Sequence, residues 1–340
     1  MHSSLSSNFP GKIPPYKVQE PTPGAHPPTR SITIDGWEIT CCSTHIMNAL
    51  QIDEAATHLS IPLPEMTFAD NHLTLRHEPS GFTYTFQALP ALSKVKVGAG
   101  WDEQGGGVRV KHADEWGKTR STGPSPLSPE TPLPTVPVKP FDWTYSTLHN
   151  GSCSTSSTSS SPSSPSLSTS IAWRPASSGE VIDLELLSRP DPILYYDEIP
   201  LFESELDDNG TSTLSARVRV MPTCLFVLLR HFLRVDGVLF RVRDVRVFHL
   251  FGSNKVVREV SGWEGEYEGV KSRLPPPFSD LSPLSSSGWV HQTLSGRRPP
   301  PGVKLEGGTK SWPGLGKTTE VLVLDRLEKN GSQKSQETDQ

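Results

Sequence analysis

The sequence predicts an α+β protein with a mainly antiparallel, sandwich-like β-sheet core, a few short helices and long disordered inserts. Strand-like segments follow one another as neighbouring hairpins and do not alternate with helices, which argues against a doubly wound sheet. Asp236-Gly237 lies between two apolar runs, a pattern typical of a tight hairpin. Pro, Ser and Thr collect in separate stretches with almost no apolar residues, which is typical of disorder.

The longest run without Pro/Ser-rich filler is 193–251, and we expect the chain to fold around it. Residues 225–235 fit either a helical face or a strand, and the Asp-Gly turn directly behind them favours a strand. Residues 238–248 are rich in Val and Phe, which also indicates a strand. A further half-buried strand that stops at Pro222 is indicated by apolar residues in alternation: Leu214, Ala216, Val218 and Val220.

A two-residue loop at Asp236 and Gly237 would pair Val235 with Val238, and the residues farther from the loop would pair in the same register. The apolar face of the hairpin would then carry Val235, Val238, Leu233, Phe240, His231, Val242 and Leu229. The opposite face would carry Arg234, Leu239, Phe232, Arg241, Arg230 and Arg243. This register places Asp244 opposite Leu229 on the apolar face. An acid there needs a partner or marks the end of the sheet.

We expect one domain over residues 30–327, with a disordered segment at 1–29 before it and a disordered tail at 328–340 after it. The stretches at 119–136 and 152–178 are predicted to be disordered inserts, because they contain too little apolar surface to order themselves. The stretch at 273–316 is predicted to be rich in loops. A last strand at 320–327 is expected to pair back onto the core.

The first third of this domain is predicted to contain short strands and one helix. A strand is expected around a turn at Asp35-Gly36, followed by a helix from Thr44. The apolar face of that helix would comprise Ile46, Met47, Leu50, Ala55, Ala56 and Leu59. A strand, a turn at Ser80-Gly81 and another strand would then direct inward Leu73, Leu75, Phe82, Tyr84 and Phe86.

Composition indicates a reducing compartment, so we expect a cytoplasmic or nuclear protein. The cysteines at 41, 42, 153 and 224 form no CxxC motif and no disulfide-like framework. No apolar run reaches membrane-spanning length, and the N-terminus lacks the apolar core of a signal peptide. A net charge of −5 argues against generic binding to nucleic acid or to anionic membranes.

No motif predicts a catalytic residue, a cofactor site or a metal site, and we expect a protein that is not an enzyme. GKTT at 316–319 imitates a phosphate-binding loop, but Ser311 stands where that motif needs Gly, and a strand-like run follows where a helix is required. A hydrolase with carboxylates at Asp197, Glu198 and Asp244 is one alternative, although their spacing matches no known site.

Seven arginines at 217, 219, 230, 234, 241, 243 and 246 follow the central strands. They are predicted to form ion pairs with the acids of the same span. A nucleic-acid-binding module that uses the arginine-rich hairpin face is the alternative, but no aromatic stacking platform accompanies these arginines.

Two blocks of the central stretch read YYDEIPLFESELDDNG and SARVRVMPTCLFVLLRHFLRVDGVLFRVRD. These blocks are similar to the TIPRL family, the TOR-signalling regulators that bind type 2A protein phosphatases. Further similarity is carried, in the family's order, by DGWEIT, PEMTFADNHLTLRH, HADEW and KPFDWTY. The resemblance covers about 31–118, 137–150 and 180–270, and the Pro/Ser/Thr-rich inserts depart from it.

The resemblance implies a non-catalytic regulatory protein that binds catalytic subunits of type 2A-like serine/threonine phosphatases and modulates TOR-linked signalling. It also implies a phosphatase-associated TOR-pathway adaptor as a second partner. No cofactor is expected, and neither nucleic acid nor membrane is expected as a partner.

We predict that the phosphatase contacts the open end of the central hairpin. Val242 and Asp244 lie near the point where the predicted hairpin stops pairing apolar residues with apolar residues. Ile182 begins an apolar run that has no assigned place in the core. The alternative is that Ile182 and Val242 are core residues and that Asp244 caps a turn. The second choice for a partner site is the acidic segment with Glu203, Glu205, Asp207 and Asp208.

Overall fold

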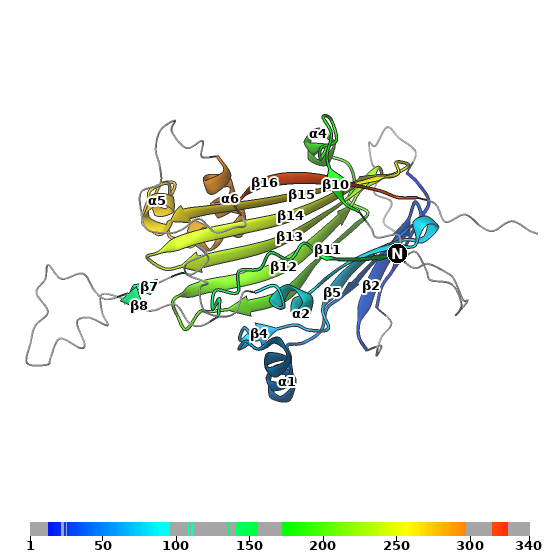
Figure 1. The fold of residues 1–340 in the computed structure, drawn as a ribbon. Coiled ribbons are helices and arrows are strands. Elements are labelled where there is room, and N and C mark those ends of the chain that lie inside the picture. The colour runs from blue at the N-terminus through cyan, green and yellow to red at the C-terminus, as the bar shows by residue number, and fades with distance from the viewer. Residues whose placement is uncertain are drawn as a thin grey trace, which may run out of the picture.

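A computed structural model describes residues 13–21, 24, 26–95, 108, 110–111, 135–136, 141–155, 172–296 and 315–325. Two antiparallel sheets dominate this part of the chain, as the sequence predicts (Figure 1). The predictions of disorder at 1–12, 119–134, 156–171 and 328–340 lie outside the described residues.

The smaller sheet has six strands in the order β1-β2-β3-β5-β6-β9. Its strands are β1 (Tyr16–Gln19), β2 (Thr29–Ile34), β3 (Trp37–Cys42), β5 (His72–His77), β6 (Phe82–Gln87) and β9 (Ser152–Thr155). β2 and β3 are joined by the predicted turn at Asp35-Gly36. All five residues that the sequence directs inward from β5 and β6 are buried.

The larger sheet has eight strands in the order β10-β16-β15-β14-β13-β12-β11-β4. Its strands are β4 (Met66–Thr67), β10 (Arg174–Pro175), β11 (Tyr195–Ser204), β12 (Gly210–Val220), β13 (Cys224–Val235), β14 (Leu239–Leu250), β15 (Lys255–Glu266) and β16 (Gly316–Val323). β13 is a strand, which confirms the choice made for the ambiguous segment. β16 pairs with β15 and so returns to the core, as predicted. A separate pair is formed by β7 (Val110–Lys111) and β8 (Thr135–Val136).

The smaller sheet packs over one end of the larger sheet (Figure 1). At that end, the ring of Trp37 lies 5.0 Å from the ring of His249. Segment 141–150 packs on the same inner face farther along the strands, where Ser212 Oγ donates to the carbonyl of Thr144 at 2.6 Å. Arg243 on β14, two strands away from Ser212, donates to the carbonyl of His149 at 2.9 Å. The inner face is therefore covered by a sheet at one end and by a strap of irregular chain at the other.

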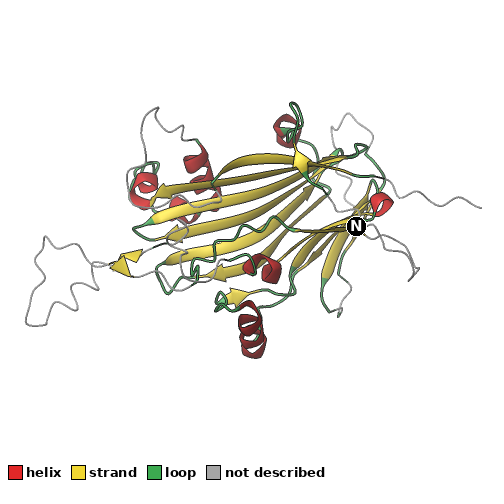
Figure 2. Cartoon of the chain, viewed as in Figure 1, coloured by secondary structure: helices red, strands yellow, loops and turns green. Residues whose placement is uncertain are grey.

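The helices lie around the two sheets (Figure 2), and two of them pack against β14 and β15. They are α1 (Ala49–Leu59), α2 (Ala88–Leu92), α4 (Leu184–Ser188), α5 (Tyr267–Lys271) and α6 (Ser287–Ser295), with the short 3-10 helices η1 (Glu78–Ser80) and η2 (Ser282–Ser285). None of these is long and apolar enough to cross a membrane. All four cysteines are free thiols.

The predicted helix from Thr44 begins later, at Ala49, and only part of its predicted apolar face reaches the core, through Met47 and Leu59. Asn48 caps the helix, because its side chain accepts from the backbone of Gln51 while Gln51 bonds back to it. No residue of α1 is buried, and Ile46 and Leu50 are 44% and 68% exposed. The cap residues thus decide the start of this helix more than its apolar pattern does.

The predicted register of the β13–β14 hairpin is wrong by one residue. Val235 pairs with Leu239, so the loop contains Val238 in addition to Asp236 and Gly237. The backbone N–H of Asp236 donates to the carbonyl of Asn209 at 2.8 Å, which ties the loop to the preceding hairpin. Because side chains alternate along a strand, this shift moves every residue of β14 to the opposite face.

Five described segments differ from the predicted disorder and loops, and one of them is β8, which lies at the end of the predicted insert 119–136 and pairs with β7. Residues 16–19, within the range predicted as disordered, form β1, whose backbone pairs with β2 and whose Val18 packs on the core. Likewise, 152–155 form β9 against β6, and 174–175 form β10 against β16. The stretch predicted as loop-rich contains α6, over the SGWVHQTL motif. In β1, β9 and β10, backbone pairing orders residues that bury little apolar surface.

We expect Gly237→Val to lower the free energy of unfolding by about 1–3 kcal/mol, because Gly237 has a φ of 68° and a β-branched residue resists that conformation. A Cβ at this position would meet nothing within 4 Å, so the loss reports backbone strain alone. Gly237→Asn is the matched control, since Asn tolerates positive φ. Urea unfolding that gives equal stability for both variants would contradict this account.

Acid should destabilise the fold through three buried histidines. Burial lowers the pKa of His149 and His249 to about 4 and that of His231 to about 3, and neighbouring cations add to the effect at His149 and His231. An unfolded histidine titrates near pH 6.5, so between about pH 6.5 and 4 the unfolded state binds more protons. Stability should therefore fall as pH falls through this window.

We expect His231→Gln to reduce the pH dependence of the unfolding free energy in this window, because about one proton fewer is taken up on unfolding. Urea unfolding at a series of pH values measures this slope. His58→Gln is the control, because that side chain is exposed on α1. A slope that stays unchanged in His231→Gln would show that this histidine is not held neutral in the fold.

Candidate partner-binding site

The outer face of the larger sheet carries two separate apolar covers. The helical cover consists of α5, η2 and α6, and it buries Phe232, Phe240 and Val242. The α4 cover consists of residues 172–188, and it buries Met221, Cys224, Phe248, Val257 and Val321 beneath Ile182 and Leu186. Polar side chains occupy the strip of sheet between the two covers.

The strip is centred on the carboxylate of Asp244, which is fully buried. Arg230 binds it through two nitrogens, at 2.7 Å and 2.8 Å, in the planar two-point geometry typical of strong guanidinium–carboxylate pairs. Arg246 donates to the same carboxylate at 2.9 Å and to Glu259 at 3.1 Å. We name the Asp244 cluster as Arg230, Asp244, Arg246, Glu259, His291 and Lys317.

The cluster joins strands to the helical cover. His291 on α6 places its Nε2 atom 3.0 Å from Arg246 and 3.4 Å from Asp244. Lys317 on β16 reaches Glu259 at 2.5 Å and is 56% exposed. The cluster therefore connects three neighbouring strands, β16 at the margin and one helix, and its exposed edge is at Lys317 and Arg246.

Burial and ion pairing oppose each other at Asp244. Burial alone would raise the pKa of its carboxyl, but the hydrogen bonds and charge of Arg230, with His291 and Arg246, hold the pKa below its ordinary value. Burial lowers the pKa of His291, so that imidazole is neutral at pH 7. Three cations then face two carboxylates, and the strip carries a small positive excess.

The structure places the predicted contacts Ile182, Val242 and Asp244 on this same outer face. They do not lie at the open end of the hairpin: Val242 and Asp244 lie within β14, and Ile182 belongs to the α4 cover. All three are buried, Ile182 at 6% exposure and the others at 0%. Asp244 faces Arg230 across the strands, where the predicted register had placed it opposite Leu229. Any contact with a partner must involve their exposed neighbours.

The predicted acidic segment lies elsewhere, at the β11–β12 connection. Glu203 is on β11, and Glu205, Asp207 and Asp208 follow in the loop. This loop is next to the β13–β14 loop, through the bond from Asp236 to Asn209. The structure therefore separates the two predicted sites along the length of the strands.

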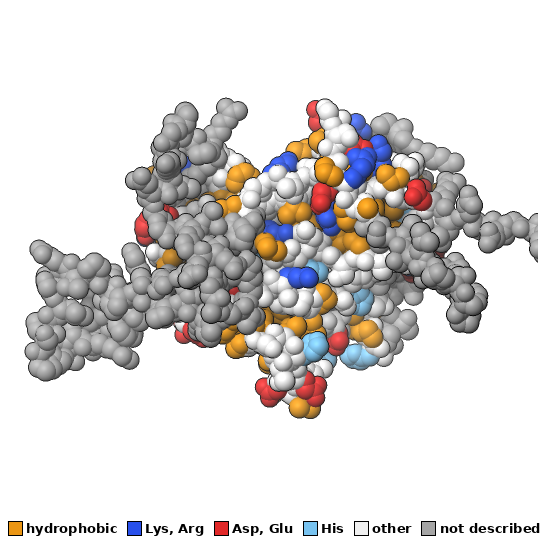
Figure 3. Space-filling model, in the orientation of Figure 1, with side chains coloured by type: hydrophobic (Ala, Val, Ile, Leu, Met, Phe, Trp, Pro, Cys, Tyr) orange, Lys and Arg blue, Asp and Glu red, His pale blue; other side chains and the backbone are white. Residues whose placement is uncertain are grey.

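Four of the seven arginines on the central strands form the predicted ion pairs with acids of the same span, and Arg241 pairs instead with Glu264 beyond it. Arg219 and Arg243 instead donate to backbone carbonyls of Leu187 and His149. Lys and Arg are scattered in small groups on the face drawn in Figure 3. This distribution does not favour the nucleic-acid alternative, which requires a continuous basic surface.

The carboxylates of the hydrolase alternative do not converge. Asp197 faces inward and pairs with Arg30 at 3.0 Å, whereas Glu198 faces outward and pairs with Arg217 at 2.8 Å. Asp244 lies three strands away from both, on β14. Among the described residues, no group of three or more side chains could hold a metal ion.

One serine–histidine contact is present on the inner face. Ser212 Oγ lies 3.2 Å from His231 Nε2, but both side chains are buried, and His231 Nδ1 has no partner. A nucleophilic serine needs an accessible hydroxyl and a group that orients the histidine. The contact therefore serves packing beneath segment 141–150.

Sequence reasoning missed most members of the Asp244 cluster. Arg230 was assigned to the face opposite Asp244 because of the one-residue register error. Glu259, His291 and Lys317 come from segments up to 73 positions away in the chain (317 − 244), and only the pairing of β14, β15 and β16 brings them together. The feature of the sequence that pointed to the cluster was Asp244, an acidic residue on a predicted apolar face.

These features define a β-sandwich protein whose larger sheet has a partly polar outer face, with no assembled catalytic group in its described residues. A model of the TIP41-like family matches residues 66–271. A Homo sapiens TIP41-like protein is 34% identical over 257 residues, which are 75% of this chain and 84% of that protein. An Arabidopsis thaliana TIP41-like protein is 34% identical over 273 residues, 78% and 87% of the two chains.

A Saccharomyces cerevisiae protein named type 2A phosphatase activator TIP41 is 33% identical over 272 residues, 77% of this chain and 71% of that one. The chain belongs to the TIP41-like family, which confirms the resemblance found in the sequence blocks.

We expect Asp244→Asn to lower the free energy of unfolding by about 3 kcal/mol or more, because it leaves Arg230 buried without a carboxylate. Glu198→Gln is the matched control: its pair with Arg217 is about 40% exposed and should cost below about 1 kcal/mol. Because the pKa of Asp244 is depressed in the fold, its contribution exists above about pH 4 and is lost as pH falls further. Equal urea midpoints for both variants would contradict a structural role for the cluster.

Proposed function

We propose that this protein is a non-catalytic regulator that binds catalytic subunits of type 2A-like serine/threonine phosphatases and acts in TOR-linked signalling. The observation that carries the proposal is family membership, with yeast relatives named as type 2A phosphatase activators at 33% and 25% identity. A phosphatase-associated TOR-pathway adaptor as second partner, and a cytoplasmic or nuclear location, are part of the same proposal.

The outer face of the larger sheet is the surface that we propose for the catalytic subunit. Ile182, Val242 and Asp244 share this face, and exposed apolar side chains stand beside the first of them. Val181 is 63% exposed and Leu184 is 64% exposed on the α4 cover. Apolar side chains next to a polar strip are the usual composition of a protein interface, with an apolar centre and a polar rim.

In this arrangement, the buried residues act through the exposed ones. Ile182 anchors the start of α4 on the sheet, and Asp183 caps that helix by accepting from the backbone of Leu186 at 2.8 Å. Asp244 fixes Arg246, whose side chain is 22% exposed. Substitution of Ile182 or Asp244 would therefore change binding and stability together, and the exposed residues give the cleaner test.

The test is direct binding of the purified full chain to a purified type 2A catalytic subunit, measured as a Kd. We expect the double variant Val181→Ser, Leu184→Ser to weaken binding about tenfold or more, because it removes two apolar contacts from the interface. Its melting temperature should match the parent, since both side chains are exposed.

Leu50→Ser is the matched control, because Leu50 is 68% exposed but lies on α1. A parent chain that does not bind the catalytic subunit would overturn the proposed function. If the parent binds and the α4 variant binds equally well, the function stands and the outer face is the wrong surface. The direction of regulation would then be measured as phosphatase turnover with and without the bound chain.

A further inference from the structure

Three connections of the larger sheet meet at the end of the strands that carries the β13–β14 loop. The backbone N–H of Asp236 donates to the carbonyl of Asn209 in the acidic loop at 2.8 Å. The backbone N–H of Tyr267, at the start of α5, donates to the carbonyl of Val238 at 3.0 Å. We call this region the loop end. It lies away from the α4 cover, which packs on the opposite ends of β13 and β14.

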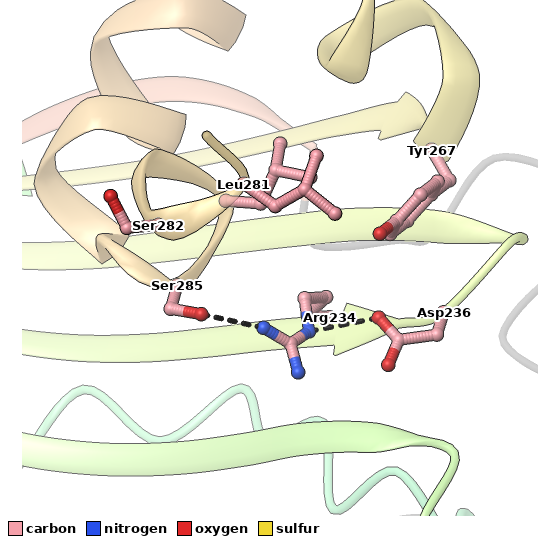
Figure 4. A pocket seen from close by; sticks show the side chains of 7 residues that line it. Arg234, Asp236, Tyr267, Leu281, Ser282 and Ser285 are labelled. Carbon is pink, nitrogen blue, oxygen red and sulfur yellow. Dashed lines mark hydrogen bonds and ion pairs between the residues drawn. The ribbon is translucent and has the colours of Figure 1, made fainter. Parts of the chain in front are cut away.

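A pocket of about 380 Å³ opens at the loop end (Figure 4). It is lined by Arg234, Asp236, Tyr267, Leu281, Ser282, Leu284 and Ser285. Nε of Arg234 lies 2.9 Å from the Asp236 carboxylate, and one terminal nitrogen donates to Ser285 Oγ at 2.7 Å. The guanidinium is thereby held by its neighbours, and the charges within the pocket cancel.

The walls of the pocket include apolar side chains that are held in place. The ring of Tyr267 stacks on the ring of Phe240 with a centroid distance of 5.2 Å and an interplanar angle of 11°. Leu284 is buried in the helical cover, whereas Leu281 is 47% exposed at the mouth. Phe278, three residues before Leu281, is 70% exposed. A pocket of this size beside exposed Leu and Phe suits one apolar side chain of a partner.

The surroundings of the pocket are acidic. Among the described residues on the β11–β12 and β13–β14 loops, on α5 and in the segments beside it, seven carboxylates stand against three cations: Glu205, Asp207, Asp208, Asp236, Glu266, Glu268 and Asp280 against Arg234, Lys271 and Arg273. Asp207 and Asp208 have φ of 53° and 65°, and the Asn209 side chain donates to the carbonyls of Leu206 and Asp207. The acidic loop thus has a defined shape against which a cation can be positioned.

We propose that the loop end binds a short basic peptide segment of a partner protein, with one Leu- or Phe-sized side chain in the pocket and Lys or Arg toward the acidic loop. The apolar side chain would contact Leu281, Leu284 and Tyr267, and charge complementarity would orient the segment. The pocket adjoins the helical cover at one end of the outer face, whereas the side chains tested for the phosphatase, Val181 and Leu184, lie on the α4 cover at the other end, so binding at the loop end does not depend on them.

The probe is the fluorescein-labelled peptide Lys-Arg-Ser-Leu-Ser-Arg-Lys, titrated with the full chain by fluorescence anisotropy at low salt. We expect Leu281→Ser to weaken its binding about tenfold, because the variant removes the exposed wall of the pocket. We expect a similar loss for Asp207→Asn with Asp208→Asn, which removes two charges and keeps a residue type that tolerates positive φ. A peptide with Ser in place of Leu should bind the parent chain about as weakly as the original peptide binds the Leu281→Ser variant.

The matched control is Asp53→Asn with Glu54→Gln on α1, where Figure 3 shows acidic side chains at the bottom of the view. This control also removes two exposed charges, so it should bind the peptide like the parent. No binding by the parent, or an equal loss in the α1 control, would overturn the proposal. Leu281→Ser should still bind the phosphatase catalytic subunit, and loss of both partners would overturn the separation of the two surfaces.

Discussion

Pairing of Val235 with Leu239 decides which side chains of β14 face the smaller sheet and which face outward. The third loop residue turns Arg241 and Arg243 inward and leaves Val242 and Asp244 outside. The outer face then carries apolar side chains on which the helical cover packs, and a carboxylate that forms an ion pair with Arg230. The inner face has two buried guanidinium groups that must be paired.

Those two inward arginines explain why an irregular strap, and not another strand, covers this end of the sheet. Arg243 is bonded to the carbonyls of His149 and Leu148 and to the side chain of Asn150. Arg241 pairs with Glu264 and donates to Ser146 Oγ. An irregular segment offers free carbonyls that a paired strand uses within its ladder. The two arginines therefore donate hydrogen bonds to carbonyls and side chains of segment 141–150, and this segment in turn supplies the acceptors that the buried guanidinium groups need.

Much of the fold could be predicted from local pattern, because alternation in β5, β6 and β12 directs the buried residues correctly. The register could not, since two-residue and three-residue loops at Asp236-Gly237 fit the same local sequence. The bond from Asp236 to Asn209 joins separate hairpins, and no local pattern reports it. The same holds for the candidate site, where Asp244 was identified but Arg230, His291 and Lys317 depend on long-range packing.

α1 is attached to the sandwich mainly at its two ends, where its own Leu59 packs partly buried on the core. Met47 and Ile61 are buried on either side of it, while no residue between Ala49 and Leu59 is buried. Its amide protons can therefore exchange with solvent through local opening, at a free-energy cost well below that of unfolding the sheets. We therefore expect changes in the length or surface of this helix to have little effect on the stability of the sandwich.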